Sequence, residues 1–531
     1  MANEDTEFAV IVIGAGINGA GIARDAAMRG LSVLLVDKGD IGGGTSSWST
    51  RLIHGGLRYL EHGELGLVRE SLREREALLK VAPHLVRPLR LLLPVYKNAR
   101  RGLWTIRAGM LAYDALSFHK SLPNHRMLSR AQTLREVPAL EPEGLLGAAV
   151  YSDAQVEFAE RLVLENVLSA VEHGATVITY AHVDKLMVEN GKVCGIEFTN
   201  EKRGKKGLAR GTIVINAAGP WVDQVLKSDS GNSPPLIGGT KGSHIVVAPF
   251  AGAPDTAVYV EAETDGRPFF IIPWDNKYLI GTTDTRYYGD LDQVRIESDE
   301  IDYLLHETNR VMPSAKLTRE QILFAYSGVR PLPFTTDADE QRITRRHFIR
   351  PHPERDNLFS IVGGKLTTYR SLAAHAVDAV FKKLGRNSPE CKTDRDPLPG
   401  AATPDFDAFC RDLKQRSPLS AATNDRLLRI YGTRAALIAG VIHEEQSLAE
   451  VFDGETGAIA AEVLFAFKHE MANTLADCMF RRTMVGFNST CGLNAVDAAA
   501  ATAQKYLGWS DERLNCEIAE YRNEVFRLRA R

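Results

Sequence analysis

The feature that most constrains this chain is a glycine-rich turn near its start, between an apolar run and a helical pattern. The run Phe8–Ile13 is apolar throughout, which is typical of a strand buried on both faces of a parallel sheet. The turn Gly14-x-Gly16-x-x-Gly19 follows it, and a second strand pattern spans residues 31–36. This order predicts a βαβ unit that binds a dinucleotide.

Each glycine of the turn has an expected role. Gly14 allows the tight turn, Gly16 lets the backbone approach a pyrophosphate, and Gly19 lets the helix pack closely on the strand. The helix N-terminus offers N–H groups and the positive end of its dipole to the phosphates. Asp37 ends the second strand and is placed to accept a hydrogen bond from a ribose hydroxyl. The motif does not identify the dinucleotide.

Length, charge and cysteine content limit the class of protein. A chain of 531 residues is too long for one core, so we expect two or three domains. The net charge of −3 gives no global attraction to nucleic acid or to anionic lipid, so any such binding must be local, and we predict no nucleic-acid partner. The six cysteines show no metal-ligand spacing, which predicts no metal and a reducing compartment. No signal peptide and no spanning segment are visible, so we predict a cytoplasmic protein, which could still lie on a membrane surface.

A loop rich in Gly, Ser and Thr spans residues 38–60. Its hydroxyl groups are natural partners for phosphate or ribityl oxygens, and they belong to Thr45, Ser46 and Ser47. The same loop brings together an imidazole, a guanidinium and a phenol, which belong to His54, Arg58 and Tyr59. An exposed loop with solvated side chains explains this segment equally well on its own.

Residues 97–116 form a basic amphipathic pattern after the predicted helix 64–82. Four cations alternate with five large apolar residues: Lys97, Arg100, Arg101 and Arg107 with Leu103, Trp104, Ile106, Met110 and Leu111. Such a helix can lie on a lipid surface. Inward packing of its apolar face is the alternative.

Later strand ends carry small residues and return to the cofactor sheet. The buried strand 213–216 ends near Gly219, and the strand 358–362 ends at Gly363, before a helix over 371–384. A strand, a glycine turn and a helix N-terminus again place backbone donors near a ligand. Between them, residues 235–290 predict an antiparallel sheet. Residues 397–404 are interpreted as a linker, and residues 405–531 as almost wholly helical.

This departure from the sheet and return to it suits a long cofactor, FAD, held by discontinuous segments. There is no second dinucleotide motif, so electrons should enter from an organic substrate. Over its whole length the sequence resembles the FAD-dependent, quinone-linked glycerol-3-phosphate dehydrogenases. The motifs that carry the resemblance are Gly14–Ala23, Thr45–Leu60, Lys241–Ile245, Gly281–Asp284, Tyr326–Leu332 and Gly363–Arg370.

The resemblance implies a multidomain α/β (α+β) fold: a Rossmann-like FAD-binding domain, an antiparallel-sheet substrate domain and a C-terminal helical cap. We assign residues 1–75, 155–230 and 330–396 to the first, 76–154 and 231–329 to the second, and 397–531 to the third. The match is weakest in the C-terminal helices.

The resemblance also implies the site. The substrate-binding residues are Arg58, Tyr59, Thr282, Arg330, Arg345 and Lys365. The cofactor-binding residues are Gly14, Gly16, Gly19, Asp37, Thr45, Ser46, Ser47, Gly219, Gly363, Lys365, Leu366 and Thr367. His54 is our first choice of base because a neutral imidazole suits that role, with Arg330 as its catalytic partner and His244 as a second candidate.

The implied reaction oxidises glycerol 3-phosphate to dihydroxyacetone phosphate and passes electrons through FAD to a membrane quinone. The implied location is peripheral, on the cytoplasmic face of the inner membrane, and a homodimer is compatible with the sequence. Three alternatives stay open: an oxidase that uses oxygen and makes hydrogen peroxide, a flavin amino-acid oxidase, and a non-catalytic flavin-binding protein.

Overall fold

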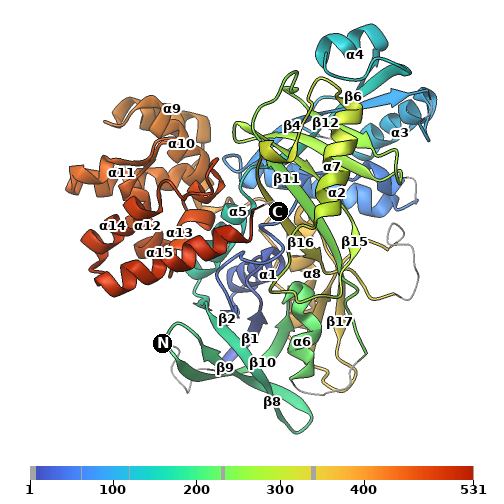
Figure 1. Ribbon diagram of the computed structural model, residues 1–531. Helices are drawn as coiled ribbons and strands as arrows, with labels where there is room; N and C mark the ends of the chain where they lie inside the picture. Colours follow the sequence, from blue (N-terminus) through green and yellow to red (C-terminus); the bar gives the residue numbers. More distant parts are fainter. Residues whose placement is uncertain are drawn as a thin grey trace.

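The computed structural model describes residues 7–60, 63–97, 99–118, 120–228, 234–335 and 343–529 of the chain. Of Arg58 it describes the backbone only. Two sheets form most of the molecule, and the C-terminal helices lie against one side of it (Figure 1).

The first sheet is the predicted nucleotide-binding sheet. Its strand order is β17 (Phe348–Pro351), β18 (Leu358–Val362), β10 (Lys205–Asn216), β1 (Glu7–Ile13), β2 (Val33–Val36) and β7 (Thr176–Ile178). The strands from β18 to β7 are parallel. The hairpin β8 (Ala181–Glu189) and β9 (Lys192–Asn200) extends from β10, and Asn190 and Gly191 have the positive φ angles that its predicted turn requires.

Both faces of this sheet are covered, as the apolar β1 sequence predicts. Val10 and Val12 pack into the core beneath α1 (Ile17–Met28), α5 (Ala159–Glu172) and α8 (Tyr369–Lys383). Ile11 and Ile13 point the other way, toward β8, β9 and α6 (Val222–Lys227). The period of two in a strand produces this division, so one strand supports two cores.

The second sheet contains the predicted substrate-domain strands. Its order is β15 (Thr285–Arg286), β11 (Thr240–Val247), β14 (Lys277–Gly281), β13 (Pro268–Trp274), β12 (Ala257–Glu261), β4 (Val86–Tyr96), β6 (Leu145–Val156) and β3 (Leu52–Ile53), with β16 (Ile322–Arg330) on β11 and β5 (Arg126–Ser129) on β6. The pairing is antiparallel except between β12 and β4. That parallel pair joins two strands that are separated in the chain by strands of the first sheet.

Helices cover both faces of the second sheet. The helix α7 (Ser298–Val311) packs on one face, and α2 (Leu65–Val81) and α3 (Leu103–Leu116) pack on the other. A short helix, α4 (Arg130–Glu136), follows β5. In α3, Ile106, Met110 and Tyr113 are buried, whereas Trp104 is 79% exposed and Leu111 58% exposed. Inward packing is therefore confirmed for the buried face of α3, and the lipid-surface interpretation of the exposed face stays a prediction.

The C-terminal part is helical, as predicted. Its helices are α9 (Phe406–Arg416), α10 (Ala421–Tyr431), α11 (Ala435–Glu444), α12 (Ala460–His469), α13 (Leu475–Arg481), α14 (Val496–Leu507) and α15 (Asp511–Phe526), with a small hairpin of β19 (Val451–Asp453) and β20 (Ala458–Ile459). The preceding linker is buried and tied down, since Leu398 N donates to Val81 O at 2.9 Å and Gly400 N to Glu165 Oε2 at 3.0 Å. No helix within the described residues is long and apolar enough to cross a bilayer.

Candidate active site

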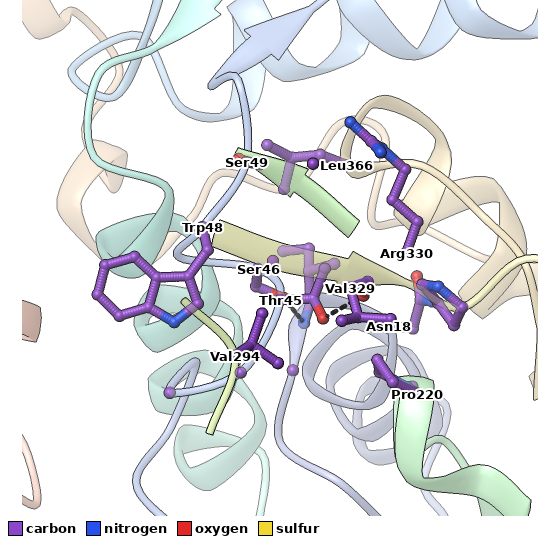
Figure 2. A pocket seen from close by; sticks show the side chains of 18 of the residues that line it. Asn18, Thr45, Ser46, Trp48, Ser49, Pro220, Val294, Val329, Arg330 and Leu366 are labelled. Atoms are coloured by element: carbon purple, nitrogen blue, oxygen red, sulfur yellow. Dashed lines mark hydrogen bonds between the residues drawn. The ribbon is translucent and has the colours of Figure 1, made fainter. Parts of the chain in front are cut away.

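A cleft of about 1780 Å³ runs between the two sheets and reaches the C-terminal helices. Its walls include the turn after β1, the loop after β2, the turn after β18, and the strands β11 and β16. Figure 2 shows the side chains of Asn18, Ser46, Arg330 and Leu366 around this pocket, although they come from segments far apart in the sequence. The cleft gathers most of the predicted site residues.

The glycine turn has the predicted geometry. Gly14 has φ +104°, and a Cβ on Gly19 would lie 1.8 Å from the carbonyl oxygen of Gly14, so the helix packs against the turn. A Cβ on Gly16 would meet only Ser46 Oγ, at 3.4 Å. Gly14 and Gly16 line the cleft, while Gly19 acts through packing. The open space beside Gly16 is where we expect a pyrophosphate to approach the protein backbone.

Asp37 holds the turn from the end of β2. Its Oδ2 accepts from Ala15 N at 2.6 Å and its Oδ1 from Gly39 N at 2.8 Å. Burial raises the pKa of Asp37, against these two bonds, which lower it. Each carboxylate oxygen keeps a further lone pair, so the predicted bond from a ribose hydroxyl stays available.

The three hydroxyl residues of the loop behave differently. Ser46 Oγ accepts from Ile17 N at 3.0 Å, at the start of α1, and Thr45 Oγ1 donates to Val329 O of β16 at 2.7 Å. Both line the cleft. Ser47 Oγ instead donates to Gly42 O at 2.6 Å, and Ser47 is absent from the described residues that line the cleft. The structure therefore does not bring Ser47 to the predicted cofactor site.

The second glycine turn lies on the same cleft. Gly363 has φ +76°, and it lines the cleft with Gly219, Leu366 and Thr367. Thr367 Oγ1 accepts from His54 N at 3.2 Å, which joins this turn to the loop that holds the predicted base. Asn18 Oδ1, at the first turn of α1, is buried without a hydrogen-bond partner among the described residues. Such an orphaned acceptor fits a ligand that donates to it.

Arginine side chains concentrate at one part of the cleft. Arg330 donates to Asp284 Oδ1 at 2.9 Å and to Thr282 Oγ1 at 2.9 Å, and Arg345 donates to Asp284 Oδ2 at 3.0 Å. Burial alone would raise the pKa of Asp284, but the two guanidinium groups hold it below its usual value. Two cations share one carboxylate, so this cluster has excess positive charge.

Lys365 adds a cation of unusual acidity. Its Nζ donates to Ser71 Oγ at 2.6 Å and lies 4.4 Å from the centre of the Tyr59 ring. Burial lowers the pKa of Lys365 to about 7. The side chain of Arg58 lies outside the described residues, so its predicted place beside Tyr59 is not described.

Both candidate bases are neutral at pH 7. Burial lowers the pKa of His54 to about 4, with Asp153 opposing and Lys365 adding to the shift. His244 Nε2 is 2.9 Å from Thr50 Oγ1, its Nδ1 has no partner among the described residues, and burial holds its pKa well below the ordinary value. Both imidazoles line the cleft.

Sequence reasoning missed four residues of this cleft and its surroundings: Asn18, Asp40, Ser71 and Asp284. Asp284 had a visible signal, because an acid two residues after Thr282 can order the arginines predicted nearby. Ser71 had none, because a serine within a helical pattern does not indicate what its hydroxyl contacts.

Comparison with known proteins fits this geometry. Residues 9–374 match the family described as FAD dependent oxidoreductase, and residues 391–514 match the C-terminal domain of alpha-glycerophosphate oxidase. A glycerol-3-phosphate dehydrogenase of Synechocystis sp. is 48% identical over 531 residues, covering 98% of this chain and 96% of its own. The chain belongs to the FAD-dependent glycerol-3-phosphate dehydrogenase family. The fold and the cofactor, FAD, are confirmed as the resemblance implied.

Two further members of the family agree. An aerobic glycerol-3-phosphate dehydrogenase of Escherichia coli is 40% identical, covering 95% of this chain and 98% of its own. A glycerol-3-phosphate dehydrogenase of Bacillus halodurans, solved in complex with FAD, superposes with a TM-score of 0.81 at 29% identity, covering 99% of this chain and 96% of that one. The similarity therefore includes the helical domain.

Proposed function

We propose that this protein oxidises sn-glycerol 3-phosphate to dihydroxyacetone phosphate and that the electrons pass to a membrane quinone. One observation carries the substrate assignment: the dinucleotide cleft contains two guanidinium groups on the single carboxylate of Asp284, with Lys365 bound to a hydroxyl. A phosphate dianion supplies the missing negative charge. The names of the family relatives support the same substrate.

Oxidation removes a hydride from carbon 2 and a proton from its hydroxyl. FAD, when bound, supplies the hydride acceptor. In this proposal Arg345, Lys365, Tyr59 and Arg58 hold the phosphate and fix the orientation of the substrate. Several donors on one phosphate would hold the substrate in a single orientation.

His54 takes the hydroxyl proton in this proposal, since a neutral imidazole has a free lone pair for it. Arg330 and Thr282 contact the substrate oxygen, and the guanidinium stabilises negative charge that develops there. His244 is the second candidate for the base, with Nε2 already beside Thr50.

The cofactor assignments and the three-domain division are part of the same proposal. The residues proposed to contact FAD are Gly14, Gly16, Asp37, Thr45, Ser46, Gly219, Gly363, Lys365, Leu366 and Thr367. Gly19 supports them by packing.

We place the membrane contact at α3. Trp104 and Leu111 are exposed there, and the Arg107 guanidinium lies 5.6 Å from the Trp104 ring centre. Figure 1 shows α3 on the side of the molecule opposite the C-terminal helices. Exposed aromatic and basic groups on one helix suit an anionic bilayer, so the protein would lie peripherally on the cytoplasmic face of the inner membrane.

Turnover of purified, FAD-loaded protein with three acceptors tests the proposal. We expect oxidation of glycerol 3-phosphate with a soluble dye and with quinone in vesicles, and little hydrogen peroxide in oxygenated buffer. Stoichiometric peroxide would identify an oxidase instead. Equal turnover of glycerol and glycerol 3-phosphate would contradict phosphate recognition by the arginines.

A further inference from the structure

Asp40 is a buried carboxylate in the loop after β2, held by the C-terminal helical domain. Its Oδ2 accepts from Arg481 Nε at 2.6 Å and from Arg482 Nη1 at 2.7 Å, and its Oδ1 accepts from Arg482 Nη2 at 2.8 Å. Asp40 is 4% exposed and Arg482 is fully buried. Arg481 ends α13 and Arg482 follows it, so the two arginines reach the carboxylate from one helix end.

The contact continues into the cofactor site. Arg481 Nη2 also donates to Asp477 Oδ1 at 2.7 Å, and that oxygen accepts from Tyr180 Oη at 2.6 Å. Tyr180 N donates to Gly39 O at 3.0 Å, and the next amide, Ala181 N, donates to Asp37 O at 2.7 Å. These bonds close a ring between α13, the turn before β8, and the segment Asp37–Asp40.

The ring is also connected to the glycine turn through hydrogen bonds. Asp37 binds Ala15 N, and the same loop carries Ser46, which binds Ile17 N at the start of α1. We call residues 37–46 the cofactor loop. A shift of Asp40 would therefore move both groups that hold the glycine turn in place.

A second ionic contact at the same domain interface provides a comparison. Glu470 accepts from Arg161 Nη1 at 2.6 Å and Nη2 at 2.8 Å, and it contacts Arg434. Glu470 is as buried as Asp40. Among the described residues, Asp40 and Arg481 line the cleft, whereas Glu470, Arg161 and Arg434 do not. The two carboxylates share chemistry, and Arg482 joins them, since its Nε donates to the backbone oxygen of Glu470 at 2.8 Å. Of the two, only Asp40 lines the cleft, and Glu470→Gln leaves that backbone bond in place.

We propose that Asp40 is a positioning residue through which the C-terminal helical domain holds the cofactor loop, so that docking of this domain and binding of FAD are coupled. The proposal concerns the cofactor and does not depend on the substrate. Coupling is reciprocal: if the domain favours FAD binding, FAD must favour docking of the domain. A carboxylate that only stabilised the fold would show neither effect.

The test compares Asp40→Asn with the matched interface variant Glu470→Gln, using full-length protein from which FAD has been removed. The Kd of FAD is measured by flavin fluorescence below the unfolding temperature, and amide exchange of α13 is measured with and without FAD. We expect Asp40→Asn to raise the Kd by roughly tenfold, within the usual range of coupling between two sites. FAD should slow exchange of α13 in the unaltered protein and in Glu470→Gln, but not in Asp40→Asn.

Tyr180→Phe removes one hydroxyl from the ring and serves if Asp40→Asn does not fold. It should raise the Kd in the same direction by less. An unchanged Kd in the folded variants would overturn the proposal. So would an equal rise in Glu470→Gln, because the effect would then follow loosening of the interface in general.

Discussion

The two ends of the cleft are built in different ways. At the cofactor end, Gly14, Gly16 and Gly19 act through their backbone and through the side chains they lack. At the proposed substrate end, Arg330 and Lys365 carry charges whose state depends on burial and on partners from other segments. Local backbone geometry can be read from a short motif, whereas the charge of a buried group depends on the folded structure around it.

The largest expected effect is on stability, and it distinguishes Gly19 from Gly16 at the cofactor end of the cleft. Gly19→Ala places a Cβ 1.8 Å from a backbone oxygen, so we expect a loss of about 3 kcal/mol or more in unfolding free energy and loss of FAD. Gly16→Ala has a permitted φ of −71° and only a distant contact, so the FAD-free protein should keep its Tm while its FAD affinity falls. Denaturant unfolding and FAD titration of both variants check this. Equal stability of both would contradict the packing role of Gly19.

A smaller effect belongs to the substrate end. Arg345→Met should lower kcat/KM for glycerol 3-phosphate roughly ten- to a hundredfold, the value of a charge-assisted hydrogen bond, and affect glycerol far less, because this guanidinium is proposed to hold the phosphate. Lys202→Met is a control, since this lysine lines the cleft but pairs with Glu520 of α15, in the C-terminal helical domain. Equal losses on both substrates would show that Arg345 does not recognise the phosphate.

The sequence predicts the geometry of the glycine turns better than it predicts the contacts of side chains and strands, for a physical reason. The strand–glycine–helix pattern predicts Gly14 and Gly363 correctly at turns, because local backbone geometry requires those residues. The direction of a hydroxyl in a loop is not local, so Ser46 faces the cleft and Ser47 does not. The parallel contact of β4 with β12 was equally hidden, because a strand sequence does not identify its neighbour.

The charge of Lys365 predicts a pH effect. Below its pKa of about 7 the lysine is protonated and can bind the phosphate, so kcat/KM should fall as pH rises through 7. Lys365→Arg should remove that fall, because a guanidinium stays charged. His54, with a pKa of about 4, stays neutral across this range and adds no change near pH 6.5. A pH profile of Lys365→Arg with the same descending limb would assign the limb to another group.

The smallest expected effect is on membrane binding, through substitutions on the exposed face of α3 that alter neither end of the cleft. Arg101 contacts Glu261 and Arg100 lines the cleft, so the sharper probes of α3 are Arg107, Trp104 and Leu111. Each cation near an anionic bilayer contributes about 1 kcal/mol, a term that salt screens.

We therefore expect Arg107→Glu with Trp104→Ser and Leu111→Ser to weaken binding to anionic vesicles and to lower turnover with vesicle quinone. Turnover with a soluble dye should be unchanged, since these side chains are not among the described residues that line the cleft. Leu437→Ser in α11 is the matched control, because that leucine is 56% exposed against 58% for Leu111. If the control weakens vesicle binding as much as the α3 variant does, the membrane contact is not specific to α3, and exposed apolar area anywhere on the protein would explain the binding.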